Sequence, residues 1–145
     1  MVTRRQQRAT VPASGPADLG AVESQRRRVL VIDDSARVRQ QVRRMLEDAG
    51  FAVVEAENAE DAAPLLRAGG FALVLCDVQM PGQNGVELLE TLQAEDQTPQ
   101  VPVVMITSEG QPSLLKRAAR AGARGWIIKP FKAQQLLETA ARLLD

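Results

Sequence analysis

The stretch FALVLCDVQMPGQNGVELL, residues 71–89, decides the fold of this chain. It opens with an apolar run, residues 71–76, which is too short for a core helix and has the length of a fully buried strand. Asp77 follows directly, so a buried strand would deliver its carboxylate to the edge of a sheet. In open parallel sheets, chemistry lies at the carboxyl ends of strands. Aspartate also caps turns, so the rest of the chain has to decide between these two roles.

Strand-like and helix-like segments alternate five times from Arg28 onward. We predict strands at 29–32, 51–55, 71–76, 101–106 and 126–128, and helices at 35–50, 58–69, 86–95, 112–121 and 132–144. Asn58 is the expected cap of the second helix, and Pro64 inside it should kink the helix or shorten its regular part. Strands that alternate with helices indicate βαβ units. Five units predict an α/β fold with an open, doubly wound parallel sheet, because an eight-unit barrel needs about twice this length.

The composition excludes several classes of protein. The formal net charge is +0, so no bulk signature of nucleic-acid binding is present. No apolar run approaches the roughly 18 residues that a membrane span needs. The chain contains no histidine, which rules out Ser-His-Asp and Cys-His catalysis and zinc sites that use histidine. The single cysteine, Cys76, lies in a predicted buried strand and indicates a reducing, cytoplasmic setting.

Residues 1–27 differ from the rest of the chain. They contain Pro12, Gly15, Pro16 and Gly20 and little apolar periodicity. We therefore predict a disordered N-terminal tail at 1–27 and a folded domain at 28–145. The arginine-rich start also suggests an organellar transit peptide, but proline and glycine disfavour the amphipathic helix that such a peptide needs.

Polar side chains stand at the ends of four predicted strands. Asp33 and Asp34 follow the first strand, Asp77 the third, Thr107 the fourth and Lys129 the fifth. In a parallel sheet these ends converge on one edge, where three carboxylates oppose one another's ionisation. A hard divalent cation such as Mg²⁺ relieves that repulsion and accepts carboxylate and phosphate oxygens. The set suits a phosphoryl group held between a metal ion, an ammonium group and a hydroxyl.

Residues 28–145 resemble the receiver domain of bacterial two-component response regulators. The motifs that carry the resemblance are VLVIDDS (29–35), LVLCDVQMPGQNG (73–85), VVMITS (103–108) and GARGWIIKPF (122–131). The resemblance implies the flavodoxin-like (βα)5 receiver fold with strand order 2-1-3-4-5. That order is carried over from the family and does not follow from the residues alone.

The resemblance also implies roles for individual residues. Asp77 would be the phosphoacceptor, and Thr107 and Lys129 would contact the phosphoryl group. Mg²⁺, or Mn²⁺ in its place, would be held by Asp33, Asp34, Asp77 and the backbone carbonyl of Gln79. Thr107 and Trp126 would form a switch, although the family usually has Tyr or Phe where this chain has Trp126. The Lys129–Pro130 bond would be cis, and Gln79 and Glu109 would tune the lifetime of the phosphoryl group.

The implied function is a stand-alone, chemotaxis-type receiver in a phosphorelay. It would take a phosphoryl group from a sensor histidine kinase or a histidine phosphotransfer protein, and it would catalyse only its own phosphorylation and dephosphorylation. We expect a downstream protein target on the face made by the fourth helix, fifth strand and fifth helix, and no DNA or membrane partner. Arg124-Gly125 replaces the acidic pair that many DNA-binding regulators use for dimerisation, so we expect a monomer.

Three alternatives stay open. The chain could be the receiver module or relay intermediate of a larger hybrid system. An aspartate-based phosphatase on a similar sheet would need an Asp-x-Asp motif after the first strand, where this chain has Asp33-Asp34-Ser35. An interaction module that works without phosphate is disfavoured because all five site residues are present.

Overall fold

The computed structural model describes residues 27–108 and 110–144. Five parallel strands form one sheet in the order β2-β1-β3-β4-β5, which confirms the predicted α/β class and strand order. The strands are β1 (Arg28–Ile32), β2 (Ala52–Ala56), β3 (Leu73–Asp77), β4 (Val103–Thr107) and β5 (Gly125–Ile128). Every residue of β3 and β4 is buried, as expected for central strands of a parallel sheet covered on both faces.

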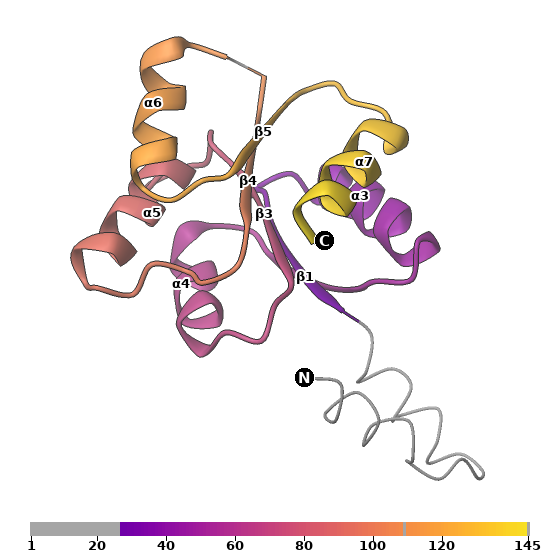
Figure 1. Ribbon diagram of the computed structural model, residues 1–145, viewed down its shortest axis with the longest axis horizontal. Coiled ribbons are helices and arrows are strands. Elements are labelled where there is room, and N and C mark those ends of the chain that lie inside the picture. The colour runs from indigo at the N-terminus through magenta and orange to yellow at the C-terminus, as the bar shows by residue number, and fades with distance from the viewer. Residues whose placement is uncertain (1–26, 109, 145) are drawn as a thin grey trace, which may run out of the picture.

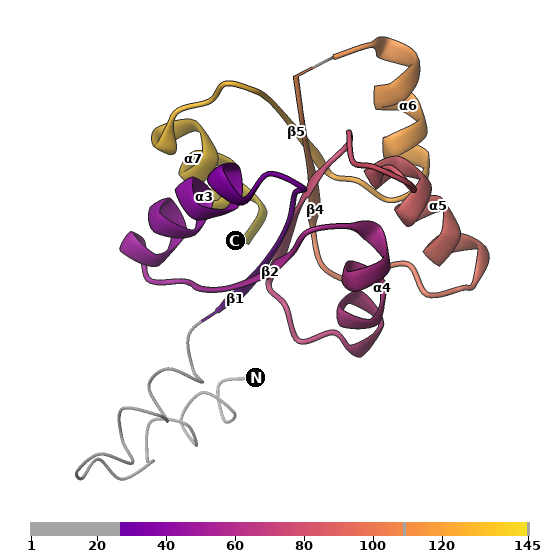
Figure 2. The same ribbon diagram turned by 180° about the vertical axis from the view of Figure 1, so that it is seen from behind.

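The helices cover the sheet in two layers. They are α3 (Ala36–Asp48), α4 (Ala59–Ala68), α5 (Gly85–Ala94), α6 (Pro112–Arg120) and α7 (Ala133–Leu144). Figure 1 shows α4, α5 and α6 on one face and α3 with α7 on the other, and Figure 2 shows the same arrangement from behind. Among the described residues, no helix has both the length and the apolar character of a membrane span.

Strand alternation divides the interior into two cores. Val74 and Cys76 of β3 face the cluster under α4, α5 and α6, whereas Leu73 and Leu75 face the cluster under α3 and α7. Successive side chains of a strand point to opposite faces, so one apolar run supplies both cores. This double burial is why residues 71–76 read as a continuous apolar run instead of an alternating one.

The structure corrects several strand boundaries by one or two residues. β3 begins at Leu73 instead of residue 71 and includes Asp77, and β4 begins at Val103 instead of residue 101. Pro102 has no N–H to give to the ladder, although its carbonyl accepts a hydrogen bond from the backbone N–H of Val74 at 3.0 Å. Apolar residues precede the first residues that pair in each of these strands, so hydrophobicity alone places the start of the strand too early.

Of the two effects expected of Pro64, a kink or a shortened regular part, the shortening does not occur. α4 is continuous from Ala59 to Ala68 with Pro64 inside it. The helix is capped as predicted, because the Asn58 side chain accepts a hydrogen bond from the backbone N–H of Asp61 at 2.7 Å. Pro64 is exposed, so its ring faces no neighbouring core side chain. The predicted tail, apart from residue 27, lies outside the described residues and stays a prediction.

Candidate functional site

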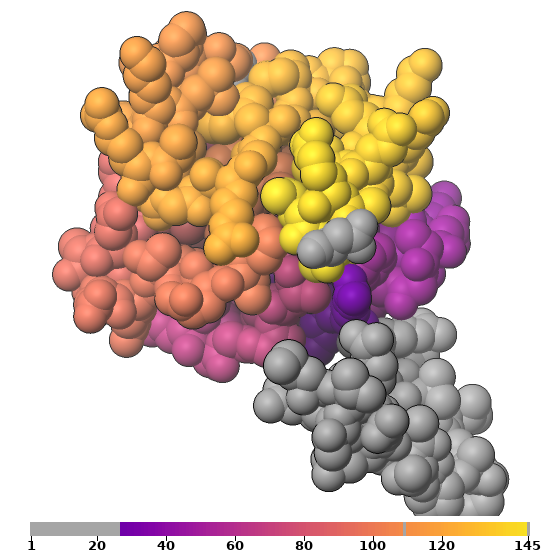
Figure 3. All heavy atoms as spheres, viewed as in Figure 1, coloured from indigo at the N-terminus to yellow at the C-terminus, as the bar shows by residue number. Residues whose placement is uncertain are grey.

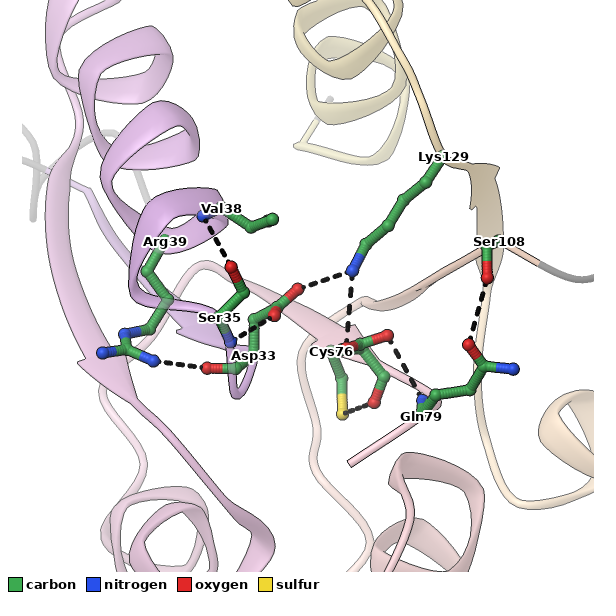
Figure 4. A network of polar contacts seen from close by, with 9 residues as sticks. Asp33, Ser35, Val38, Arg39, Cys76, Gln79, Ser108 and Lys129 are labelled. Atoms are coloured by element: carbon green, nitrogen blue, oxygen red, sulfur yellow. Dashed lines mark hydrogen bonds and ion pairs between the residues drawn. The ribbon is translucent and has the colours of Figure 1, made fainter. Parts of the chain in front are cut away.

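Four neighbouring strands bring polar residues to one edge of the sheet. Asp77 ends β3 and Thr107 ends β4, while Asp33 follows β1 and Lys129 follows β5. These strands are adjacent in the sheet, so their carboxyl ends converge as the sequence predicts. Figure 4 shows the Lys129 side chain reaching from the end of β5 toward Asp33.

Lys129 links the two buried carboxylates. Its Nζ lies 2.9 Å from Asp33 Oδ2 and 3.4 Å from Asp77 Oδ2. Each carboxylate also accepts a backbone N–H two residues further on, from Ser35 to Asp33 Oδ1 at 2.9 Å and from Gln79 to Asp77 Oδ1 at 3.2 Å. Both aspartates are only 3% exposed, so their positions are fixed by the sheet and by these bonds.

Asp34 completes a group of three carboxylates. One oxygen of each of Asp33, Asp34 and Asp77 lies within 4.8 Å of the others. Asp34 is exposed, whereas the other two are buried, so the group is open to solvent on one side. An oxygen-only donor set with an open side fits Mg²⁺, which keeps several water ligands. A cleft of about 700 Å³ adjoins Asp34 and is lined by residues 57–60 and 81–83.

The positive charge at the site does not fully offset the cost of ionising the buried Asp77 carboxyl. Burial, and then the negative charge of Asp33, raise the pKa of Asp77 from its ordinary 3.8 to about 6, although Lys129 and the backbone N–H of Gln79 oppose the rise. Burial alone would lower the pKa of Lys129, but its hydrogen bond to Asp33 and the charges of both aspartates raise it overall. One ammonium group therefore does not offset the cost of two buried carboxylates, and a cation at the site would.

Cys76 lies beside this group without sharing in its chemistry. It is buried, and its Sγ lies 3.4 Å from the carbonyl oxygen of Asp77. Burial, followed by the charges of Asp77 and Asp33, raises the pKa of the thiol well above its usual range. The thiol therefore stays protonated and serves as a small core group, which agrees with the prediction that Cys76 lies in a buried strand.

The predicted switch pair lies on neighbouring strands. Thr107 is fully buried, and its carbonyl oxygen accepts a hydrogen bond from the backbone N–H of Lys129 at 2.7 Å. Trp126 on β5 is half-buried and packs against the core under α4, α5 and α6. Its Nε1 is buried and has no hydrogen-bond partner among the residues that the structure describes. The Lys129–Pro130 peptide bond is cis.

Gln79 lies at the mouth of the site. Its exposed side chain accepts a hydrogen bond from the Ser108 hydroxyl at 3.0 Å, which joins the loop after β3 to the loop after β4 (Figure 4). The sequence pattern did not identify Ser108 as a partner, because the two residues are 29 positions apart. Glu109 lies outside the described residues.

Sequence reasoning also missed two residues that shape the site. Arg39 lies outside the apolar face of α3, but its side chain is only 14% exposed and donates to the backbone carbonyl of Asp33. Gly85 lies just before the helix predicted at 86–95, yet it is buried, and a Cβ there would clash with the carbonyl oxygen of Asp77. Helix periodicity carries no signal for either contact, since both depend on how α3 and α5 pack against the sheet.

Comparison with known proteins agrees with this geometry. The pattern of the response regulator receiver domain family matches residues 29–141. The chain is 34% identical to the chemotaxis protein CheY of Pseudomonas aeruginosa over 119 residues, covering 81% of this chain and 96% of the relative. It is 35% identical to CheY-3 of Vibrio cholerae, covering 86% of this chain and 97% of that protein.

Solved structures give the same answer. The structure of Vibrio cholerae chemotaxis protein CheY4 superposes with a TM-score of 0.75 at 34% identity, covering 82% of this chain and 99% of that one. A CheY-like receiver domain protein from Methanospirillum hungatei superposes with a TM-score of 0.77 at 29% identity, covering 83% and 95%. With the strand order, the acidic group and the family pattern in agreement, the chain belongs to the response regulator receiver domain family, and its similarity is to chemotaxis-type receivers.

Proposed function

We propose that Asp77 accepts a phosphoryl group from a phosphohistidine on a sensor histidine kinase or a histidine phosphotransfer protein. The observation that supports this most is the buried Asp77 carboxylate, held at a strand end beside Lys129 and two further acids. The chain has no histidine, so the histidine of any such relay belongs to the partner. The cleft beside Asp34 gives a partner side chain a way to approach.

Asp33, Asp34, Asp77 and the backbone carbonyl of Gln79 are the proposed ligands of Mg²⁺ or Mn²⁺. When bound, the cation would neutralise charge that develops on the phosphoryl oxygens. An Asp77 carboxylate oxygen attacks phosphorus, the P–N bond to imidazole breaks, and the leaving nitrogen keeps the electron pair and takes up a proton. Lys129 stabilises the product as a point charge, and the Thr107 hydroxyl donates to a phosphoryl oxygen.

In this proposal the chain acts on no substrate other than itself. The same residues would support attack of water on the acyl phosphate of Asp77 and so end the signal. Gln79 and Ser108 close part of the mouth through their hydrogen bond. We therefore assign the chain a signalling role and no turnover of a separate substrate.

A small phosphodonor tests the phosphoacceptor chemistry directly. We expect the protein to gain one phosphoryl group when it is incubated with a phosphoramidate or acyl phosphate and Mg²⁺. Chelation of the metal should suppress the gain, since three clustered carboxylates otherwise repel the donor. Intact mass spectrometry measures it. Equal labelling with and without the chelator would contradict the proposed role of the cation.

The proposed output face consists of α6, β5 and α7. Figure 3 shows that atoms of the chain from α6 to α7 form one continuous surface in that view. Basic side chains lie along it, namely Lys116, Arg117, Arg120, Arg124 and Lys132. Arg117 is already paired with Glu90 of α5, so the remaining charges are those available to an acidic or amphipathic helix of a partner. We propose that the protein is a monomer when it presents this face.

The indole of Trp126 should report the coupling between site and face. Its buried Nε1 lacks a partner in the described structure, so rotation toward solvent would satisfy a donor that is now unpaired. We expect a beryllofluoride mimic of the phosphoryl group to change the emission of this single tryptophan, and Thr107→Ala to reduce the change. A steady emission with the mimic bound, together with unchanged partner binding by Lys116→Glu, would refute this output route.

A further inference from the structure

The turn between β1 and α3 carries Asp33 and Asp34, but the structure fixes the two residues differently. The backbone N–H of Asp33 donates a hydrogen bond to the carbonyl oxygen of Ala56 at 3.1 Å. Its carboxylate accepts hydrogen bonds from the backbone N–H of Ser35 and from Lys129 Nζ. Asp34 is exposed, and its carboxylate has no hydrogen-bond partner within the described part of the chain. The direction in which the Asp34 side chain points therefore depends on the orientation of the peptide plane between Asp33 and Asp34.

Arg39 holds that peptide plane from the side. Its Nη1 donates to the carbonyl oxygen of Asp33 at 2.6 Å, a bond that Figure 4 shows. Its Nε donates at the same time to Glu55 Oε1 on β2 at 2.9 Å. A guanidinium is a rigid fork, so fixing one of its nitrogens on Glu55 also orients the nitrogen that contacts Asp33.

Arg43 provides an internal comparison one helical turn further along α3. Its Nε donates to the other oxygen of Glu55 at 2.6 Å, and its Nη1 donates to Glu47 at 3.0 Å. Arg43 thus shares Glu55 with Arg39, but none of its hydrogen bonds goes to the turn that carries the acidic pair. Burial alone would raise the pKa of Glu55, but its hydrogen bonds to Arg43 and Arg39 and the charges of these two arginines lower it overall.

We propose that Arg39 is a positioning residue for the divalent-cation site. By clamping the Asp33 carbonyl to β2, it presents the otherwise unsupported Asp34 in the orientation that brings its carboxylate oxygen within 4.8 Å of those of Asp33 and Asp77. The inference rests on the proposed function, because it concerns affinity for the cation at the same site. It adds a residue outside the acidic group that sets how well the group binds.

The proposal predicts a loss of metal affinity without a loss of fold. Groups that orient metal ligands typically change metal affinity about 10- to 100-fold when they are removed. Arg39→Gln should therefore bind Mg²⁺ about tenfold more weakly than wild type, at the lower end of that range, because Asp33 keeps its other three bonds. Arg43→Gln should stay within about twofold of wild type, since it removes only partly exposed ion pairs.

Isothermal titration calorimetry with MgCl₂ on the full chain measures these affinities, and thermal melts in EDTA report whether each variant unfolds cooperatively. Arg39→Lys is the second variant, and it should also bind Mg²⁺ more weakly, because a single ammonium cannot bridge Asp33 and Glu55 as a fork does. In phosphodonor labelling at saturating Mg²⁺, Arg39→Gln should be labelled to the same extent as wild type. It should need a higher Mg²⁺ concentration than wild type to reach half of that extent.

The outcomes separate this inference from the function on which it rests. Wild-type affinity in Arg39→Gln or in Arg39→Lys overturns the clamp, and so does an equal loss in Arg43→Gln. If Arg39→Gln does not fold, the comparison of Arg39→Lys with Arg43→Gln decides. If wild type itself binds no Mg²⁺, the proposed function fails and this inference fails with it.

Discussion

Asp77→Asn is expected to accept no phosphoryl group while keeping the fold. The amide has the size of the carboxylate, but it carries no charge and its oxygen is a poor nucleophile. Loss of a nucleophile typically costs several orders of magnitude, so labelling by a small phosphodonor should fall roughly 1,000-fold or more. Intact mass spectrometry after incubation with donor and Mg²⁺ measures the labelled fraction over time.

Asp96→Asn is the matched control for this substitution. Asp96 is exposed and has a φ of 58°, a backbone conformation that asparagine tolerates as well as aspartate. The control should label at the wild-type rate. Labelling of Asp77→Asn at a comparable rate would assign the phosphoacceptor to another carboxylate, with Asp33 and Asp34 the nearest.

Asp77→Asn should also be more stable than wild type at neutral and higher pH when no metal is bound. The pKa of Asp77 is raised to about 6 from 3.8, so the folded state binds this proton more tightly than the unfolded state does. Wild type consequently loses stability as pH rises from about 4 to 6 and carries the full cost above that range. A shift of this size corresponds to about 3 kcal/mol, and solvent at the mouth of the site reduces the expected effect to about 1–2 kcal/mol.

Urea denaturation in EDTA at pH 5 and at pH 8 tests whether Asp77→Asn raises or lowers the free energy of unfolding. The stability difference between Asp77→Asn and wild type should be larger at pH 8 than at pH 5. Mg²⁺ should narrow this difference by stabilising wild type more than the variant, which keeps only Asp33 and Asp34 as carboxylate ligands. A variant that is less stable than wild type at pH 8 would show that the contact between Lys129 and Asp77 outweighs the cost of burying this carboxylate.

The order of elements and the converging strand ends could be predicted because they depend on local patterns. Apolar runs of strand length, separated by amphipathic helices, admit few arrangements once crossovers are right-handed. A polar residue that directly follows such a run has to reach the sheet edge. The positions of Asp33, Asp77, Thr107 and Lys129 therefore follow from the sequence, whereas their chemical roles come from the family resemblance.

Contacts between distant segments could not be predicted in this way. The pattern of α3 places Arg39 away from the apolar stripe, but a long side chain reaches 16 positions along the sequence to Glu55. That Trp126 Nε1 has no hydrogen-bond partner among the described residues likewise depends on how Trp126 packs against the core under α4, α5 and α6. Boundaries such as the start of β4 at Val103 are set by which backbone groups pair, and a proline inside an apolar run hides that choice.

Gly85→Ala is expected to destabilise the protein by about 2–3 kcal/mol, near the upper end of the usual cost of overpacking. Gly85 begins α5, and its backbone N–H donates to the carbonyl of Val78 at 2.9 Å. An added Cβ would clash with the carbonyl oxygen of Asp77 and lie 2.9 Å from Cys76 Sγ. Asp77 belongs to a fully buried strand, so the helix has to move away from the site residue, and phosphodonor labelling should fall together with stability.

The sign of this effect separates packing from helix propensity. By propensity alone, alanine in a helix is up to about 1 kcal/mol more favourable than glycine, so a variant without a clash would be neutral or more stable. Gly110→Ala is the control, because a Cβ added at Gly110 would meet, among the described residues, only the tip of the flexible, exposed Ile128 side chain, at 3.2 Å. The stability of this variant should stay within about 0.5 kcal/mol of wild type. Urea denaturation compares the two variants. A Gly85→Ala protein as stable as wild type would mean that α5 does not press against the Asp77 carbonyl, and the close approach inferred for this loop would be wrong.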